Sequence, residues 1–306
     1  MIGIAIAGTL VAFNFSSIRA ALFPPEFTED TNPTAGPAAV STEPTQISTS
    51  LIPDGLWSEV LDKGYILIAN DPDFAPQSSL KTVGFRPGDS KCPADSLTSA
   101  EMQGFDVDVA VRISENLGVE PCFVSPPWDE IAAGNWNAGW DIHVGSMTIT
   151  TSRQAVLDFS VPYYFNPAVV AVYEGVDVDT LDDLAGRTLC AQAGSTYESW
   201  LTHAPMELPA SSIFFDAPEK VSSLVLDTDT LCAENVVELK GLKVLVGYVT
   251  SQWVVDAQIA DGLPLRRLGS AVFSEDLAIA FDKNSSYPTS SLRKRVDEII
   301  TQMHED

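Results

Sequence analysis

Residues 104–118 read GFDVDVAVRISENLG, and residues 128–164 read WDEIAAGNWNAGWDIHVGSMTITTSRQAVLDFSVPYY. The first segment predicts a helix, because its apolar residues recur at helical spacing and Gly118 suits the position after the last turn. The second segment contains the apolar run Ile142-His143-Val144, which is typical of a strand. Helices that alternate with strands indicate βαβ units, and therefore a largely parallel sheet.

The same alternation continues along the chain. Strands are predicted at residues 65–69, 119–124, 141–144, 168–173, 188–191, 244–249 and 277–281. Helices, some of them short, are predicted at residues 106–117, 128–136, 221–226, 233–239, 251–259 and 289–303. No repeat at a solenoid period is visible, so these elements predict an α/β fold rather than a repeat array.

The two quoted segments resemble the family 3 extracellular solute-binding proteins, the polar amino-acid receptors of ABC importers. The family pattern runs G-F-D-V-D, then W-D near a helix, then M-[ST]-I-T-x-x-R, then D-F-S-x-P-Y-Y, and every element occurs here in that order. The segment GRTLCAQAGSTYES at residues 186–199 resembles the family's second-lobe motif. The resemblance covers residues 56–306.

This resemblance implies a two-lobed, periplasmic-binding-protein-like fold of type II. Each lobe is then a mostly parallel sheet flanked by helices, and two crossing strands form a hinge between the lobes. The ligand is expected in the cleft between them. Lobe 1 is expected at residues 56–165 plus 277–306, and lobe 2 at residues 166–276.

The beginning of the chain has a different character. Residues 1–18 carry no charge and are mostly apolar. We expect residues 1–21 to be an export signal or a short membrane anchor, with a buried helix or strand as the alternative. Residues 22–55 are rich in Pro, Thr and Ser, which predicts an extended tether. An apolar start followed by a tether indicates an extracytoplasmic protein, exported or anchored at its N-terminus.

The composition is strongly acidic, since 42 Asp and Glu against 17 Lys and Arg give a net charge of −25. Such a surface repels phosphate backbones and anionic lipid headgroups, so nucleic acid is not an expected partner. Three histidines and four cysteines, without a C-x-x-C motif, leave little material for a metal centre. We therefore expect neither a metal nor a cofactor.

The cysteines are even in number, which in an exported chain is typical of disulfides. Under the expected lobe assignment, Cys92 and Cys122 fall in lobe 1, whereas Cys190 and Cys232 fall in lobe 2. We therefore expect these two pairs, with buried free thiols as the alternative.

Arg153 is one of the few basic residues and stands beside a cluster of Ser and Thr. A guanidinium group can hold a carboxylate by two parallel hydrogen bonds. Ser146 and Thr148 offer hydroxyl and N–H donors for the same anion. By the resemblance, these three residues bind the ligand's carboxylate from lobe 1; the alternative for Arg153 is a surface ion pair.

The resemblance places further residues at the cleft. Phe74 and Trp128 match the family's two aromatic walls, with ordinary core packing as the alternative for each. Asp71 is a candidate for a cationic end of the ligand, or a simple Asp-Pro turn. Ser195 and Thr196 follow a strand and open a helix, whose free N–H groups can bind the carboxylate or form an ordinary cap.

One position departs from the family pattern. Many amino-acid receptors carry an Asp after the strand predicted at residues 244–249, where it pairs with the ligand's α-ammonium, and Ser251 is the best match here. A hydroxyl accepts a hydrogen bond but cannot neutralise an ammonium group. Either another acid, such as Glu198 or Asp216, supplies the charge, or the ligand lacks a standard α-ammonium.

Three functions compete. A binding protein without catalysis would be a monomer that closes on a polar amino acid, or a derivative, and delivers it to an ABC permease. An enzyme on the same fold would resemble the cyclic-carboxylate dehydratases and would need a cleft acid, for which Glu198 is the nearest candidate. A sensory ectodomain would need a signalling module, and none follows Asp306. We expect the binding protein.

Overall fold

The computed structural model describes residues 51–208, 212–240 and 245–305. The expected export signal or anchor at residues 1–21, and the tether up to residue 50, lie outside the described residues. In the part that is described, no helix has both the length and the apolar character needed to cross a membrane. Residues 51–306 form a unit of their own, to which the following description applies.

The first half of this unit builds lobe 1, which the C-terminal helix completes. Its elements are α2 (Gly55–Lys63), β1 (Tyr65–Ala69), β2 (Asp73–Phe74), β3 (Ser78–Leu80), β4 (Leu97–Thr98), β5 (Met102–Gln103), α3 (Phe105–Leu117), β6 (Glu120–Val124), α4 (Trp128–Ala132), β7 (Ile142–Thr148), α5 (Thr151–Gln154), β8 (Leu157–Phe159) and α9 (Ser290–Glu305). β1 pairs in parallel with β6 on one side and with β7 on the other. These three central strands of lobe 1 are therefore parallel, whereas β4 at the edge is antiparallel to β6.

Lobe 2 repeats this arrangement with different strands. Its elements are η1 (Leu181–Leu184), β10 (Thr188–Gln192), α6 (Thr196–Leu201), β11 (Ser222–Leu226), α7 (Asp229–Glu238), β12 (Leu245–Ser251), α8 (Gln252–Ala260) and β13 (Leu265–Arg267). β10 pairs in parallel with both β11 and β12. The helices α6, α7 and α8 begin shortly after β10, β11 and β12, so helix starts lie at the carboxyl ends of these three strands.

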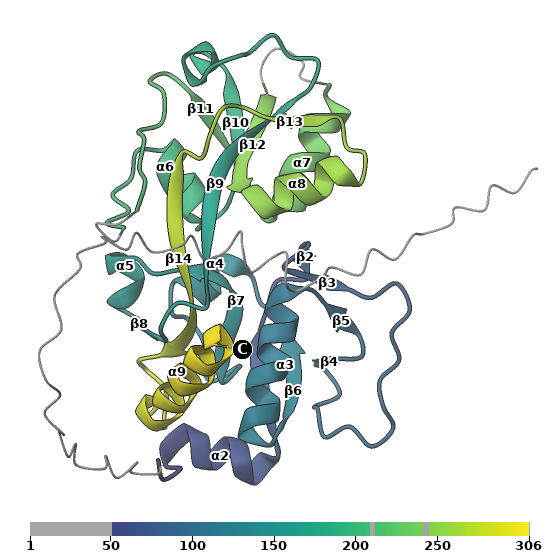
Figure 1. The fold of residues 1–306 in the computed structure, drawn as a ribbon, viewed down its shortest axis with the longest axis vertical. Coiled ribbons are helices and arrows are strands. Elements are labelled where there is room, and N and C mark those ends of the chain that lie inside the picture. Colours follow the sequence, from purple (N-terminus) through teal and green to yellow (C-terminus); the bar gives the residue numbers. More distant parts are fainter. Residues whose placement is uncertain (1–50, 209–211, 241–244, 306) are drawn as a thin grey trace, which may run out of the picture. The chain divides into compact units, whose positions relative to one another are not determined.

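Two long strands, β9 (Tyr164–Tyr173) and β14 (Phe273–Asp282), connect the lobes. They are antiparallel to each other; β9 continues into lobe 2 beside β12, and β14 into lobe 1 beside β7. The strand order β11-β10-β12-β9-β14-β7-β1-β6-β4 thus runs through both lobes (Figure 1). The predicted α/β class, the two lobes and the two crossing strands are confirmed. The predicted boundaries after residues 165 and 276 fall inside β9 and β14.

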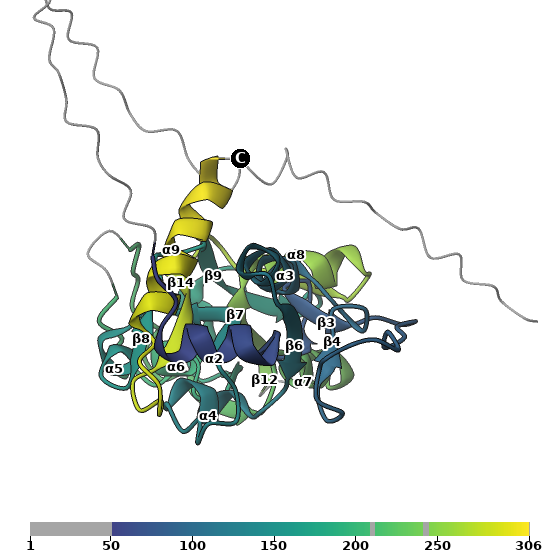
Figure 2. The ribbon, with the colours of Figure 1, turned by 90° about the horizontal axis from the view of Figure 1, so that it is seen from below.

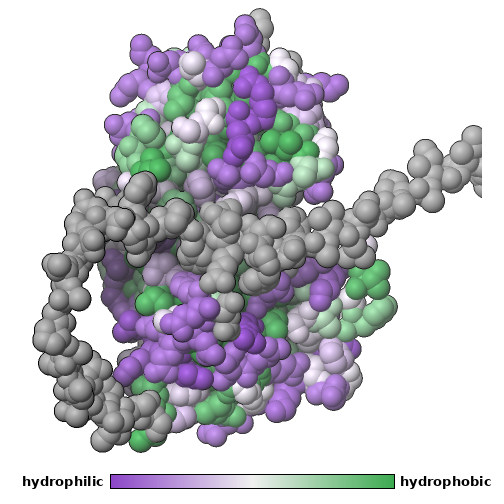
Figure 3. All heavy atoms as spheres, viewed as in Figure 1, coloured by the Kyte–Doolittle hydropathy of each residue, from purple (hydrophilic) through white to green (hydrophobic). Residues whose placement is uncertain are grey.

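The helices of lobe 1 follow the predicted apolar stripes. α3 buries Val107, Ala110, Ile113 and Leu117, and it ends at Gly118, whose φ of 76° lies in the left-handed region that glycine adopts without strain. α9 contacts both α2 and α3 (Figures 1 and 2). Hydrophilic residues cover much of lobe 1 on the face where these helices lie (Figure 3).

One predicted element has the wrong type. Residues 221–226 were expected to be helical, but Ser222–Leu226 form the strand β11. The segment is only five residues long, which is short for a stable helix, and its backbone groups pair with β10 instead. The helix that follows begins at Asp229, earlier than the predicted residue 233, because the Thr228 side chain accepts a hydrogen bond from Leu231 N and caps it.

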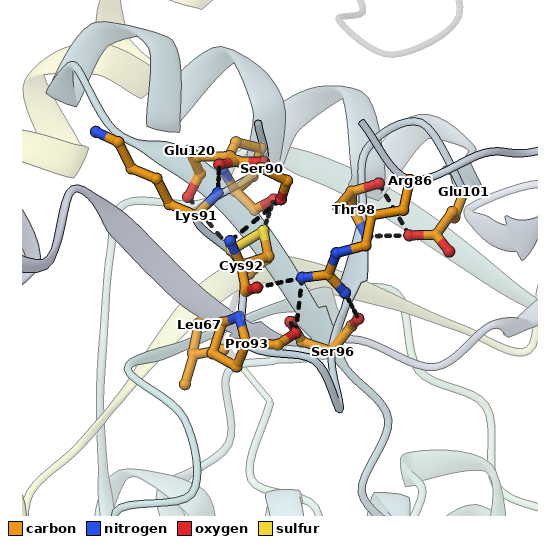
Figure 4. Close-up of a disulfide and its surroundings, with 12 residues drawn as sticks. Leu67, Arg86, Ser90, Lys91, Cys92, Pro93, Ser96, Thr98, Glu101 and Glu120 are labelled. Atoms are coloured by element: carbon orange, nitrogen blue, oxygen red, sulfur yellow. Dashed lines mark hydrogen bonds between the residues drawn. A yellow bond between two sulfur atoms is a disulfide. The ribbon is translucent and has the colours of Figure 1, made fainter. Parts of the chain in front are cut away.

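The structure contains both expected disulfides, Cys92–Cys122 and Cys190–Cys232. The first ties the long segment between β3 and β4 to β6. Figure 4 shows how Arg86 also holds this segment, with its guanidinium donating hydrogen bonds to the carbonyl oxygens of Cys92, Pro93 and Ser96. The second disulfide ties α7 to β10 within lobe 2.

Candidate functional site

A cavity lies between the two lobes, beside the crossing strand β14. The residues that line it are Asp71, Phe74, Trp128, Gly145, Ser146, Thr148, Arg153, Gln192, Ser195, Thr196, Tyr197 and Glu275. This set contains every predicted ligand-binding residue except Ser251. The cavity volume is about 20 Å³, room for roughly one or two water molecules, so a larger molecule can enter only if the lobes move apart.

Arg153 reaches the cavity from the short helix α5, directly after β7. The Thr150 side chain caps this helix by accepting a hydrogen bond from Arg153 N at 3.2 Å. The guanidinium donates to the Thr148 carbonyl at 3.0 Å and, across the cleft, to the Gly194 carbonyl at 3.1 Å. Its Cζ lies 5.5 Å from the centroid of the Trp128 ring, within cation–π range. These contacts fix the orientation of the fork and use only part of its five N–H groups.

Arg153 keeps its positive charge inside the cleft. Burial lowers the pKa of its guanidinium to about 10, while the charge of Glu275 and the hydroxyl of Tyr197 act in the opposite direction. At neutral pH the group is therefore fully cationic. Among the described residues that line the cavity, it is the only basic one.

Glu275, on β14, joins the two lobes through its carboxylate. Oε1 accepts hydrogen bonds from the hydroxyls of Thr148 in lobe 1 and Thr196 in lobe 2. Oε2 accepts from Asn166 Nδ2 at 2.9 Å and from the Tyr197 hydroxyl at 3.1 Å. The side chain is buried, and four donors satisfy it. The hydroxyls of Thr148 and Thr196, expected to face a ligand carboxylate, thus face a carboxylate of the protein itself.

Ser146 is held at the cavity wall in an unusual backbone conformation, with a φ of 58°. Its hydroxyl donates to Asp106 Oδ2 at 2.7 Å, and its backbone N–H donates to the Tyr163 hydroxyl at 2.8 Å. The Tyr163 hydroxyl in turn donates to Asp106 Oδ1 at 2.7 Å. Burial raises the pKa of Asp106 to about 7, although both hydroxyl donors oppose this. The network shows that a non-glycine residue in a strained conformation is fixed by several hydrogen bonds at once.

Two aromatic side chains form the apolar part of the wall. Phe74 is buried, and Trp128, at the start of α4, is half-buried. The Trp128 ring also packs edge-on against His143 at 5.5 Å between centroids. Burial, followed by the charge of Arg153, lowers the pKa of His143 to about 3, so the imidazole is neutral. It therefore adds no second cation to the site.

The lobe 2 wall is formed at the start of α6. Ser195 is its cap, since its hydroxyl accepts from Glu198 N at 3.1 Å and donates to the Gln192 carbonyl at 2.6 Å. The Glu198 carboxylate accepts a hydrogen bond from Gly194 N at 2.7 Å. The Glu198 carboxylate is therefore already hydrogen-bonded, and Glu198 is not among the residues that line the cavity. Asp216, the other acid considered as a source of negative charge, is exposed.

Ser251 lies at the end of β12, away from the cavity wall. Its buried hydroxyl donates to Asn166 Oδ1 at 2.7 Å and accepts from Trp253 N at 3.2 Å, so that it caps α8. Its neighbour Thr250 points elsewhere and donates a hydrogen bond to Asp229. The structure therefore connects Thr250, rather than Ser251, with a buried acid.

The opposite part of the cleft is acidic and also joins the lobes. Asp71 accepts a hydrogen bond from Asp73 N at 2.9 Å and, across the cleft, from Gln192 Nε2 at 3.0 Å. Gln192 Nε2 also donates to the Asp227 carbonyl at 3.1 Å, and the Thr230 hydroxyl donates to the Asp73 carbonyl at 2.8 Å. Burial is the main cause of a raised pKa at Asp71.

Four lining residues were not predicted from the sequence: Gly145, Gln192, Tyr197 and Glu275. Three of them adjoin predicted site segments, since Gly145 precedes Ser146 and Gln192 and Tyr197 flank the predicted pair Ser195 and Thr196. Glu275 lies far from every other lining residue in the sequence. The acid pair Glu275-Asp276 just before the apolar strand predicted at residues 277–281 is the only local signal for it.

A family model described as "Bacterial extracellular solute-binding proteins, family 3" matches residues 82–306. The L-cystine-binding protein TcyJ of Escherichia coli (strain K12) is 28% identical over 154 residues, which are 50% of this chain and 52% of that protein. The ABC transporter arginine-binding protein 1 of the same strain is 26% identical over 125 residues, or 40% of this chain and 51% of that protein. The chain thus matches these curated relatives over about half of their length.

Among solved structures, the fold is similar to that of the ancestral amino acid-binding protein AncCDT-1, a precursor of cyclohexadienyl dehydratase. The TM-score is 0.64 at 22% sequence identity, and the match covers 82% of this chain and 94% of that chain. At this level of identity the similarity concerns the fold. It extends to both lobes, because most of each chain is covered.

Proposed function

We propose that this chain, which belongs to the bacterial extracellular solute-binding proteins of family 3, captures an amino acid or a close derivative between its lobes. The observation that carries the proposal is the buried, cationic Arg153 in the wall of the cavity. Its fork donates to the Thr148 carbonyl of its own lobe, so it stays oriented for a carboxylate when the contact with Gly194 across the cleft is broken. Phe74 and Trp128 supply flat apolar surface for the rest of the molecule.

Binding requires the lobes to open and close. Hydrogen bonds from Arg153 to Gly194, from Gln192 to Asp71 and from Thr230 to Asp73 cross the cleft directly. Because the cavity between them is small, a ligand must enter while these contacts are broken and be enclosed when they form again. The crossing strands β9 and β14 are the elements about which such a motion can occur.

The partner in this proposal is the permease of an ABC importer, and the chain acts as a monomer outside the cytoplasm. Support comes from the family assignment and from the name of one relative, an ABC transporter arginine-binding protein. Two disulfides suit an oxidising compartment. Residues 1–21 are expected to be either a cleaved export signal or a retained anchor. N-terminal sequencing of the mature protein distinguishes these two outcomes.

We propose binding without catalysis. A dehydratase of cyclic carboxylates would need a proton-donating acid in the cleft. Glu198, the residue considered for this role, accepts a hydrogen bond from Gly194 N and does not line the cavity. The relatives named above are binding proteins.

A thermal-shift screen of L-amino acids, amines and small carboxylates tests the proposal. A ligand at 100 times its Kd stabilises the protein by about 2.7 kcal/mol, which raises the Tm by roughly 5–10 °C for a chain of this size. We expect such a shift from at least one amino acid, and none from the same compound with the Arg153→Ala variant. If no amino acid shifts the Tm of the wild-type chain, the proposal is wrong.

A further inference from the structure

Asp229 carries a buried carboxylate oxygen with no partner. The residue opens α7 and is 1% exposed. Its Oδ2 accepts the hydroxyl of Thr250, whereas its Oδ1 has no hydrogen-bond partner among the described residues. Leaving a buried carboxylate oxygen unpaired is costly, and such groups are rare in folded proteins. Asp229 therefore needs an explanation that the fold itself does not provide.

Neighbouring negative charges further raise the cost of a negative charge on Asp229. Asp71 and Glu275, both in the cavity wall, lie close enough for their negative charges to act on Asp229. Asp229 also adjoins the contacts that close the cleft, since Asp227 and Thr230 on either side of it bond to Gln192 and to Asp73. Two lining carboxylates thus lie near a third, that of Asp229, which does not itself line the closed cavity. Among the described lining residues, Arg153 is the only cation.

The three carboxylates differ in their unused capacity. Glu275 accepts four hydrogen bonds, and Asp71 accepts one on each oxygen. Only Asp229 keeps an oxygen without a donor. A cationic N–H group placed there would supply both the missing hydrogen bond and a counter-charge.

We propose that Asp229 accepts a hydrogen bond from a cationic nitrogen of the ligand, with Asp71 and Glu275 completing the negative surroundings, and that the ligand is an amino acid with a net positive charge. This inference rests on the proposed function and narrows its ligand class. With Asp71 and Glu275 against the one guanidinium in the lining, ionisation of the adjacent Asp229 leaves the site short of positive charge. A zwitterion does not change that sum, whereas an amino acid with a basic side chain does.

The site suits an organic cation rather than a metal ion. In the described part of the chain, no group of three or more His, Cys, Asp and Glu side chains could hold a metal. Phe74 and Trp128 line the same cavity and can pack on a planar or aliphatic cationic side chain. Charge, unpaired acceptor and aromatic surface therefore indicate the same class of molecule.

The first test compares two ligands of nearly equal shape. L-Citrulline has the outline of L-arginine, but a neutral urea replaces the guanidinium. We expect the wild-type chain to bind L-arginine at least about 10-fold more tightly by calorimetry, as charge-assisted hydrogen bonds require. Equal affinities for the two would overturn the assignment of a net positive ligand and leave the proposed function intact.

The second test removes the charge of Asp229 and keeps its shape. Asp229→Asn should weaken L-arginine binding on the order of 10- to 100-fold. Glu234→Gln is the matched control, because Glu234 is an exposed acid on the same helix, and it should change the Kd by less than about twofold. An Asp229→Asn affinity within twofold of wild type would overturn the role of Asp229.

A proton count separates direct contact from a merely structural effect. Burial raises the pKa of Asp229 to about 7, with Asp71 and Glu275 adding to the rise and Thr250 opposing it. The charge of Asp229 also acts on the hydroxyls of Tyr197 and Tyr248. A cation bound to this carboxylate favours its ionised form, so wild-type binding near pH 7 should release a fraction of a proton. Calorimetry in buffers of different ionisation enthalpy measures this release, which should disappear in Asp229→Asn. An unchanged release would contradict direct contact.

Agmatine, which is arginine without its carboxylate, separates the proposed cation contact at Asp229 from the proposed amino-acid function. If agmatine binds in a manner that depends on Asp229 while no amino acid binds, the cation site is supported and the amino-acid function is wrong. If neither agmatine nor any amino acid binds, both proposals are wrong.

Discussion

The regions around Glu275 and Asp229 hold two buried carboxylates in opposite states. Glu275 accepts hydrogen bonds from four side chains that belong to both lobes. Asp229 receives one, and its second oxygen has no partner among the described residues. A fully satisfied carboxylate acts as part of the protein's framework, whereas a half-satisfied one beside a ligand cavity keeps an acceptor for another molecule. The comparison thus separates a structural acid from a ligand-binding one.

The largest expected effect comes from Glu275→Ala. The substitution leaves the hydroxyls of Thr148, Thr196 and Tyr197 and the amide of Asn166 without their common acceptor. We expect the free energy of unfolding to fall by about 3–5 kcal/mol, as measured by urea denaturation. Asp229→Asn should cost less than about 1 kcal/mol, because it also removes repulsion with Asp71 and Glu275. Equal losses for the two variants would break the comparison.

The two disulfides should contribute similarly to stability but differ in their effect on ligand affinity. Replacing either pair by serine should cost about 4 kcal/mol in the chain-entropy model, since the bridges span 30 and 42 residues. Only Cys190–Cys232 links α7, which carries Asp229, to β10, which carries Gln192. Its loss should therefore also weaken cation binding, as calorimetry would show. If loss of Cys92–Cys122 weakens binding equally, α7 is not positioned by its own bridge.

Arg153→Ala tests the cationic part of the site, which should bind the ligand's carboxylate. A ligand carboxylate that loses its guanidinium partner should bind on the order of 100-fold more weakly, or about 3 kcal/mol. Arg153→Lys should restore binding only in part, because an ammonium group cannot form two parallel hydrogen bonds. Competition calorimetry measures both variants. An alanine variant with near-normal affinity would remove Arg153 from the site.

Most of the lobe 1 site could be predicted because its residues lie close together in the sequence. Ser146 and Thr148 lie in β7 and Arg153 in the short helix α5 that follows, so a short motif contains them all. The parallel strands and the helices of lobe 1 could be predicted for a similar reason, since their apolar patterns are local. The motif does not reveal, however, that the Thr148 hydroxyl donates to a residue 127 positions away.

Glu275 and Asp229 could not be predicted as site residues from the sequence. They come near the cavity only because β14 crosses between the lobes and because α7 packs against the sheet of lobe 2. Glu275 and Asp229 have no motif around them, and nothing local shows that Thr250 faces Asp229. Ser251 was considered at this position because strand ends are uncertain by a residue or two, and a shift of one residue turns a side chain to the other face of the sheet. The strand at Ser222–Leu226 was missed because so short a segment, with only its last three residues apolar, fits either period.

The pH dependence of stability tests a third buried acid, Asp106. Its pKa is raised to about 7 by burial, so between about pH 4 and pH 7 the folded chain holds this proton more tightly than the unfolded chain does. The free energy of unfolding should therefore fall as the pH rises through that window. Asp106→Asn should reduce the loss by on the order of 1–2 kcal/mol, as measured by urea denaturation at pH values across the window. A variant with the wild-type slope would contradict this assignment.

The smallest expected effect is that of Ser251→Ala. The substitution removes the cap of α8 and the hydrogen bond to Asn166, which should cost about 1 kcal/mol of stability. Affinity for amino acids should change by less than about threefold, because the Ser251 hydroxyl is already engaged with Asn166 and Trp253 N. A loss of affinity without a loss of stability would place Ser251 in the site after all.

A crystal structure of the chain with L-arginine tests the central claim most directly, since it shows where each charge of the ligand lies. We expect the ligand's carboxylate within about 3 Å of the Arg153 guanidinium and a cationic nitrogen within about 3 Å of Asp229 Oδ1. Glu275 should keep its four donors. A ligand whose nitrogens contact Glu275 instead, with Asp229 Oδ1 left unpaired, would contradict the division between a structural and a ligand-binding carboxylate.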